Sequence, residues 1–447
     1  MKKSTKMFTR ILFIALAMVV SWGAAGQIAP NTTEIEVEGI KMIARESVKG
    51  TVSMRTFIRG GVNNYSMEFQ GVEELMLSMI AEGGPESTSK VMYQQQLETI
   101  GAQISSSSGY DYGNISLSSI KEYFYDAVEI YLEAISNPAF RQEDFDLIKN
   151  RMITNARQAK TNPDAHLMDL AMESTWEGTD YEKKPSGNVE TLEAMSLDLV
   201  KKYYSNVFIK KNIFMILVGD IPPAKVKEFV HQSKMSKLPE GKESNWFVAE
   251  DGVQSGLKVE DRNIETNYIM GVFSAPNKGT EESVHNALAM RILGMRFFEE
   301  LRTKRSLSYA PSARSTGYIA RPMNQIYIST TDPEQSLEVM IDLVNAVRTE
   351  GYESKELEGT KQSFLTNYYM GQETNSSISM SLGVNEIQDS YKNMDRFTER
   401  VLNTSLEDIN TVISTYGDEI NWTYLGKEDM VKPKYFKQPV KTKKIKN

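Results

Sequence analysis

The chain has 447 residues, of which 25% are charged and 40% are hydrophobic, and its formal net charge at pH 7 is −8. This length predicts two domains of about 200 residues each, and the composition is that of a folded protein rather than a disordered one. The acidic balance argues against a nucleic-acid partner. The absence of cysteine excludes disulfides, a thiol nucleophile and thiolate-bound zinc.

The first 26 residues have the order of a secretory signal peptide. A basic head is followed by an apolar run over residues 11–20, and the small residues Ala24 and Gly26 precede Gln27. The alternative is an N-terminal membrane anchor, but the apolar run is shorter than the roughly 20 residues that a span requires. We therefore expect cleavage before Gln27, export, most naturally to the periplasm, and no stable membrane insertion afterwards.

Residues 27–235 are expected to form a first domain. Alternation over 51–58 predicts a strand, and the Ser-, Tyr- and Gly-rich segment 101–117 predicts a hairpin. Helical spacing of apolar residues predicts three helices, over 71–80, 167–176 and 197–204.

The second half of the chain repeats the first at a spacing of roughly 210 residues, which predicts a duplicated domain. Three pairs of segments correspond in the same order: 143–155 with 355–367, 195–200 with 404–409, and 214–220 with 421–426. The first two pairs open helices with Ser, Thr or acidic residues, and the third ends a strand at a glycine. Helices grouped around sheets in this way indicate an α+β fold. The polar, aperiodic stretch 236–258 is expected to link the first domain to a second one over 259–447.

Residues 297–309, with the sequence FFEELRTKRSLSY, are the most informative segment. The pattern predicts the end of a helix carrying Arg302, a short basic turn, and a strand that begins at Tyr309. This geometry can bring a guanidinium and a phenol together from two elements. The simplest alternative is structural: Arg302 would pair with a neighbour such as Glu299, and Tyr309 would cap a core. If the turn requires a positive φ, Ser306 costs about 1 kcal/mol there.

This segment closely resembles the second-half signature of the pitrilysin/insulinase metallopeptidases, in which an arginine–tyrosine pair holds substrate; Ser306 stands where the family usually has glycine. The resemblance extends over roughly residues 33–426. It implies two duplicated pitrilysin/insulinase-like domains, each a mostly antiparallel sheet with helices packed around it. It also implies that Arg302 and Tyr309 bind substrate.

The family's zinc motif, Gly-Leu-x-His-Phe-Leu-Glu-His, falls on residues 71–78, where its two histidines and its glutamate are absent. The resemblance places Glu74 and Ser78 at the histidine positions, Leu77 at the catalytic glutamate, and Asn155 at the distal ligand. Ser78 and Asn155 are poor zinc ligands, and Leu77 cannot polarise water. We expect no catalytic residue, no bound metal and no cofactor in this chain, although Glu73, Glu74 and Glu82 could form a weak hard-cation site.

No other catalytic arrangement is evident. The three histidines, His166, His231 and His285, are far apart in the sequence, so each is expected to be isolated rather than a ligand. There is no Gly-x-Ser-x-Gly motif and no phosphate-binding glycine loop, and the serines of 105–108 have no adjacent histidine.

Small members of the family work as dimers of a zinc-bearing subunit and a metal-free subunit that carries the arginine–tyrosine pair. The resemblance therefore implies a non-catalytic, peptide-binding subunit of an exported zinc metallopeptidase heterodimer, inactive alone. Two alternatives stay open. One is a stand-alone peptide-binding or assembly protein that acts as a homodimer, and the other is a divergent hydrolase that uses the acidic residues near Glu73.

Overall fold

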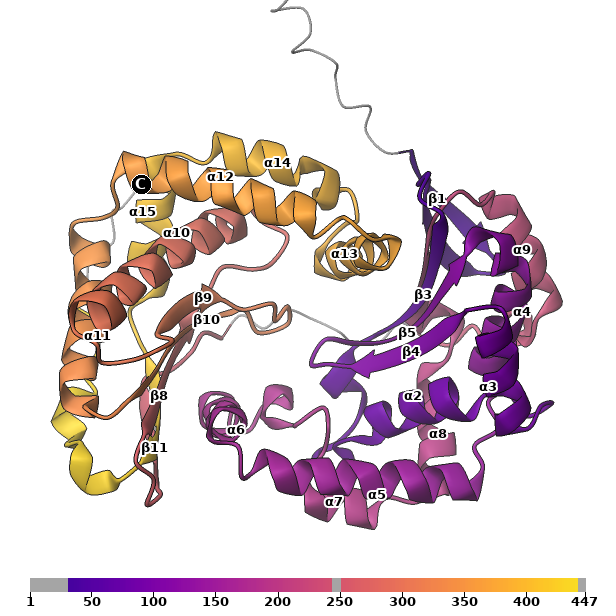
Figure 1. The fold of residues 1–447 in the computed structure, drawn as a ribbon, viewed down its shortest axis with the longest axis horizontal. Helices are drawn as coiled ribbons and strands as arrows, with labels where there is room; N and C mark the ends of the chain where they lie inside the picture. The colour runs from indigo at the N-terminus through magenta and orange to yellow at the C-terminus, as the bar shows by residue number, and fades with distance from the viewer. Residues whose placement is uncertain (1–30, 243–250, 441–447) are drawn as a thin grey trace, which may run out of the picture.

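The computed structural model describes residues 31–242 and 251–440 and contains two sheets, each with helices packed around it (Figure 1). The first sheet has the strand order β1-β2-β6-β3-β5-β4, and the second has the order β7-β11-β8-β10-β9. The strands are β1 Thr32–Val37, β2 Ile40–Arg45, β3 Thr51–Arg59, β4 Gln103–Ser108, β5 Tyr112–Ile120, β6 Ile213–Val218, β7 Gly256–Asp261, β8 Asn267–Ser274, β9 Ser312–Ser315, β10 Met323–Thr330 and β11 Asn421–Gly426.

The two sheets have the same topology once β1 is set aside. Each contains one parallel pair, β2 with β6 and β7 with β11, and its other neighbouring strands are antiparallel. In both sheets, the last strand of the half lies between the first two strands of that half: β6 lies between β2 and β3, and β11 lies between β7 and β8. This repeated order confirms the predicted α+β fold and its duplicated, mostly antiparallel domains.

The helices also correspond between the halves. They are α2 Val72–Gly83, α3 Lys90–Thr99, α4 Phe124–Ser136, α5 Gln142–Ala159, α6 Pro163–Thr175, α7 Val189–Ala194, α8 Leu197–Val207, α9 Pro223–Gln232, α10 Glu281–Phe297, α11 Pro333–Thr349, α12 Ser354–Met370, α13 Asn375–Gln388, α14 Asn393–Asn403 and α15 Leu406–Tyr416. The predicted pairs appear as α5 with α12 and α8 with α15. The side chains of Ser196 and Ser405 accept hydrogen bonds from backbone amides in the first turns of α8 and α15, as the N-cap chemistry predicts.

Each half places one helix on the sheet of the other half. Helix α6 of the first half packs on β8, β11 and β7, and α13 of the second half packs on β3 and β6. Figure 1 shows α6 beside the second sheet and α13 beside the first. The opposite faces of the sheets are covered from within each half, by α2 and α4 in the first and by α10 and α11 in the second. The two halves are therefore interlocked rather than merely adjacent.

Two predicted boundaries were wrong. The expected linker 236–258 begins inside a 3₁₀ turn, Lys234–Lys237, and its last three residues belong to β7, because β7 pairs in parallel with β11. The strand expected to open at Tyr309 begins at Ser312, directly after Pro311, which has no N–H to donate to a ladder. The expected signal peptide lies outside the described residues. Within the described ranges, no helix combines the length and apolar content needed to cross a membrane.

Candidate functional site

A tight reversal of the chain follows α10. The helix continues as a π-helical turn, Phe298–Lys304, in which Leu301 is fully buried in the second core. Ser306 then adopts φ 54°, its amide donates to the carbonyl of Arg302 (3.1 Å), and the amide of Leu307 donates to the carbonyl of Leu301 (2.8 Å). The turn does require a positive φ, and it keeps that conformation with serine in place of glycine. It returns the chain over the helix end.

The reversal stacks Arg302 between two aromatic rings. Its guanidinium carbon lies 4.3 Å from the ring centroid of Tyr309 and 4.7 Å from that of Phe298. Tyr309 is 78% exposed and Phe298 is 45% exposed, so the stack stands on the surface and Tyr309 caps no core. Cation–π stacking of this kind fixes the guanidinium plane while its N–H edges stay available to a ligand. The structure thus brings the two sequence-predicted residues into contact.

The neighbouring charges pair with one another rather than with Arg302. Lys304 lies 3.0 Å from Glu299 and 2.6 Å from Glu300, and Arg305 also contacts Glu300. The predicted alternative, an ion pair between Arg302 and Glu299, is therefore not what forms. Sequence reasoning missed Phe298, although its position four residues before Arg302 on a helical surface is a usable signal.

The positions of the degenerate metal motif lie on two helices that pack together, α2 and α5. Glu74 and Ser78 are half-buried on α2, Leu77 is fully buried, and Asn155 is exposed on α5. Burial raises the pKa of Glu74, and the nearby cation of Arg151 opposes that shift. Within residues 31–242 and 251–440, no group of three or more His, Asp or Glu side chains is placed to hold a metal ion.

Glu73 turns away from these positions and into the core. Its carboxylate accepts hydrogen bonds from the hydroxyls of Tyr203 (2.6 Å) and Ser108 (2.9 Å), and burial raises its pKa to about 7. Glu82 instead pairs with Arg151 on the surface, at 3.0 Å between its Oε2 and Nη1. The acidic trio considered as a hard-cation site, Glu73, Glu74 and Glu82, therefore does not converge.

The three histidines lie in separate places, each beside a carboxylate. His166 on α6 contacts Glu260 of β7 (2.8 Å), His231 contacts Glu38 (2.7 Å), and His285 lies 4.0 Å from Asp408. Among residues 31–242 and 251–440 none of these pairs has a third ligand, so the histidines act as local contacts, and the first of them joins the two halves.

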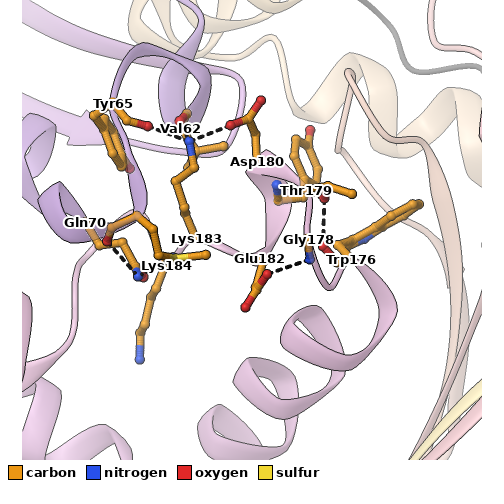
Figure 2. Close-up of polar contacts among 12 residues, drawn as sticks. Val62, Tyr65, Gln70, Trp176, Gly178, Thr179, Asp180, Glu182, Lys183 and Lys184 are labelled. Atoms are coloured by element: carbon orange, nitrogen blue, oxygen red, sulfur yellow. Dashed lines mark hydrogen bonds and ion pairs between the residues drawn. The ribbon is translucent and has the colours of Figure 1, made fainter.

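A buried lysine anchors the loop that precedes α2. Figure 2 shows the Lys183 ammonium donating to the carbonyls of Val62 (2.8 Å) and Tyr65 (2.5 Å) and to the carboxylate of Asp180 (2.5 Å). The amide of Lys184 donates to the Gln70 side chain (2.8 Å), immediately before α2 begins. These hydrogen bonds fix the backbone that leads into α2, the helix that carries the degenerate zinc motif. No periodicity or motif in the sequence signals these hydrogen bonds.

A buried aspartate joins the halves at the chain reversal between β4 and β5. Asp111 accepts a hydrogen bond from the hydroxyl of Tyr181 (2.5 Å) and from the backbone amides of Ile319 (3.0 Å) and Ala320 (2.8 Å). Those amides belong to the loop between β9 and β10 of the second half. The junction therefore connects the tip of one hairpin to the tip of its counterpart.

Two models of one peptidase family match consecutive parts of this chain. The model described as "Insulinase (Peptidase family M16)" matches residues 41–187, and the model described as "Peptidase M16 inactive domain" matches residues 194–364. The two together match well over half of the sequence. The chain belongs to peptidase family M16.

Some curated M16 relatives are named as proteases, and another is named as a non-peptidase. An "Uncharacterized zinc protease" of Rickettsia bellii is 21% identical over 350 residues, which are 76% of this chain and 83% of that protein. The "Non-peptidase homolog YmxG" of Helicobacter pylori is 23% identical over 331 residues, which are 71% of this chain and 75% of that protein.

Solved structures share the M16 fold over nearly the whole chain. A peptidase M16 inactive domain from Pseudomonas fluorescens superposes with a TM-score of 0.82 at 19% identity, over 90% of this chain and all of the other. A protease from Helicobacter pylori superposes with a TM-score of 0.81 at 14% identity, over 89% and 99% of the two chains. With the family's zinc motif lost, this chain is an inactive M16 homologue.

Proposed function

We propose that this chain is the non-catalytic, peptide-binding subunit of an exported zinc metallopeptidase heterodimer, and that Arg302 and Tyr309 complete the active site of its partner. The observation that carries the proposal is the exposed stack of these two side chains in a family member that lacks the zinc motif. The stack leaves the phenol hydroxyl and the guanidinium N–H edges on the surface, where a ligand can reach them.

The stack suits the chemistry of a bound peptide. A guanidinium donates several hydrogen bonds to carbonyl or carboxylate oxygens, and a phenol donates one more. Strand β9, which starts three residues after Tyr309, ends its sheet, as β4 ends the first sheet. An extended peptide can add to such a sheet edge through main-chain hydrogen bonds. Peptide carbonyls would then come within reach of the stack.

The test is reconstitution with the catalytic partner, captured with this chain from the native envelope and identified by mass spectrometry. Arg302→Ala and Tyr309→Phe should leave the complex assembled but lower its peptidase activity. A donor aimed at a developing oxyanion is worth about 10²–10³ in kcat, whereas a donor that only positions peptide changes mainly KM. Arg305→Ala in the same turn is the matched control, because Arg305 is already paired with Glu300.

Full activity of the Arg302→Ala complex would overturn the proposal, and so would loss of folding in that variant, because it would reveal a structural role. Isolation of the chain as a homodimer, with peptide binding but no zinc-bearing partner, would instead support the stand-alone alternative. Zinc in the complex should reside in the partner. The chain by itself should bind substoichiometric zinc in metal analysis and hydrolyse no peptide, since it lacks three good ligands. Chelator-sensitive cleavage by the chain alone would contradict both statements.

A further inference from the structure

On the face of the first sheet that packs against α13 and α14, cationic side chains contact carboxylates of these two helices. Lys41 and Arg59 both contact Glu386 of α13, at 2.8 and 3.4 Å, and Arg45 contacts Asp395 of α14 at 2.7 Å. Each of these three side chains therefore meets a carboxylate supplied by the opposite half. The pattern is the usual one for charged groups removed from water, which are stable there when they are paired.

Arg55 of β3 lies on the same face of the sheet but contacts no carboxylate among the described residues. It is only 7% exposed. Among the described residues its guanidinium contacts neutral groups alone: the Asn114 side-chain oxygen, the Ser379 hydroxyl (3.4 Å from Nε) and the Ser376 hydroxyl (3.3 Å from Nη2). The two serine contacts are at the long limit of hydrogen bonding. A guanidinium has five N–H donors, so two of them have no acceptor in this set.

The surroundings of Arg55 add positive rather than negative charge. Ser376 lies in the first turn of α13, whose N-cap is Thr374, and Ser379 is one turn further along. The N-terminus of a helix carries a partial positive charge, so the guanidinium and the helix end repel each other. Burial lowers the pKa of Arg55, and no carboxylate of the described chain opposes that shift. A buried cation in such surroundings is stabilised by a bound anion.

The site is least buried at Ser376, which is half-buried. The hydrogen bonds from Nε and Nη1 of Arg55 are buried, whereas the bond from Nη2 to Ser376 is only partly buried. Polar side chains continue from there to the sheet edge, since Asn114 donates to the Ser107 hydroxyl (2.6 Å). Ser107 lies on β4, which is the edge strand, and is exposed. A chain of amide and hydroxyl hydrogen bonds therefore connects the Arg55 guanidinium to the edge strand.

We propose that Arg55, with Asn114, Ser376 and Ser379, forms a carboxylate-binding subsite for peptide held in the chain. A carboxylate presents two oxygens in the plane that matches the guanidinium fork, and the Ser376 hydroxyl can donate to a remaining lone pair. The Ser379 hydroxyl already donates to the Ser376 carbonyl (2.8 Å) and serves as an acceptor for Arg55. The carboxylate is either the C-terminus of the peptide or an acidic side chain. That the ligand is a peptide rests on the proposed function, whereas the anion site itself stands on the contacts of Arg55.

The anion site is tested first without peptide, by thermal unfolding of the mature chain in sodium acetate and in sodium chloride at equal ionic strength. Acetate should raise the Tm of the native protein by about 2–4 °C relative to chloride, because it binds only the folded state. Arg55→Gln should abolish this difference. If that variant does not fold, Arg55→Lys, which keeps the charge and loses the fork, should reduce it. An equal acetate effect in the native protein and the folded variant would overturn the site.

The carboxylate source is tested with three fluorescent octapeptide pools, measured by anisotropy. One pool has free C-termini and no acidic residues, one is amidated with a single Glu, and one is amidated and neutral. A pool that supplies the correct carboxylate should bind at least about tenfold more tightly than the neutral pool, and Arg55→Gln should remove that advantage. Equal affinity for all three pools would overturn the peptide subsite. Binding of no pool, with the acetate effect intact, would contradict the proposed function and leave the anion site standing.

Discussion

Glu73 is a buried carboxyl whose ionisation affects the stability of the fold. In the folded chain its carboxyl is fully buried and its pKa is raised from the ordinary value of 4.5 to about 7. Between these two pH values the folded state binds more protons than the unfolded state, so the free energy of unfolding falls as pH rises. The contribution of Glu73 is fully present below about pH 4.5. Above pH 7 about 3 kcal/mol of it is lost, since one pKa unit corresponds to about 1.4 kcal/mol.

Glu73→Gln should therefore raise the Tm at pH 8 and change it little at pH 5, because the amide stays neutral at both values and can accept the same hydroxyl bonds. Thermal unfolding monitored by circular dichroism at the two pH values measures the difference. Glu98→Gln on the exposed face of α3 is the control and should show no such pH dependence. A Tm gain of equal size at both pH values would contradict the assignment.

Substitutions of Ser306 test the backbone conformation of the turn that brings Arg302 and Tyr309 together. A non-glycine residue at φ 54° is strained by about 1 kcal/mol, so Ser306→Gly should stabilise the chain by roughly that amount. Ser306→Val should destabilise it further, because a β-branched side chain fits this backbone conformation poorly. Urea denaturation gives both values. A glycine variant less stable than the native protein would show that the serine makes a compensating contact.

Among the secondary-structure elements, the close packing of α13 on the first sheet depends on one glycine. A Cβ built on Gly383 would lie 2.0 Å from the ring of Phe57 on β3, so the helix approaches the sheet closely at this point. Gly383→Ala should therefore cost about 1–3 kcal/mol, as overpacking does in a filled core. Gly359→Ala on α12 is the matched control. A Cβ there meets nothing within 4 Å, and helix propensity predicts a gain of about 0.5–1 kcal/mol. Equal effects in chemical denaturation would contradict the close approach.

Local pattern predicted the elements well, and tertiary contacts explain what it missed. The spacing of apolar residues gave the helix at 71–80, and the segment match gave the turn that brings Arg302 to Tyr309. The same spacing could not show that Glu73 faces the core, because its partners Tyr203 and Ser108 are distant in the sequence. The sequence likewise did not show that α6 and α13 each pack on the sheet of the other half. Their periodicity shows that a face is buried without showing which sheet buries it.

For the whole molecule, Asp111 is one of the buried residues that join the two halves. Removing its carboxylate leaves the Tyr181 hydroxyl and two backbone amides of the second half without an acceptor, so Asp111→Ala should cost about 1–3 kcal/mol. It should also speed hydrogen exchange at the amides of Ile319 and Ala320. Asp332→Ala, which removes only the N-cap of α11, is the control. It should cost about 1 kcal/mol without affecting those two amides. Unchanged exchange in the Asp111 variant would show that other contacts hold the halves together.

The crossing of α6 and α13 bears on how such a chain could arise. The two helices occupy the same place in the order of their halves, and each packs on the sheet of the other half. Two identical subunits that swap one helix about a two-fold axis have this same arrangement. One chain that carries both halves makes within itself the helix exchange that a two-fold pair of half-length chains would make between subunits.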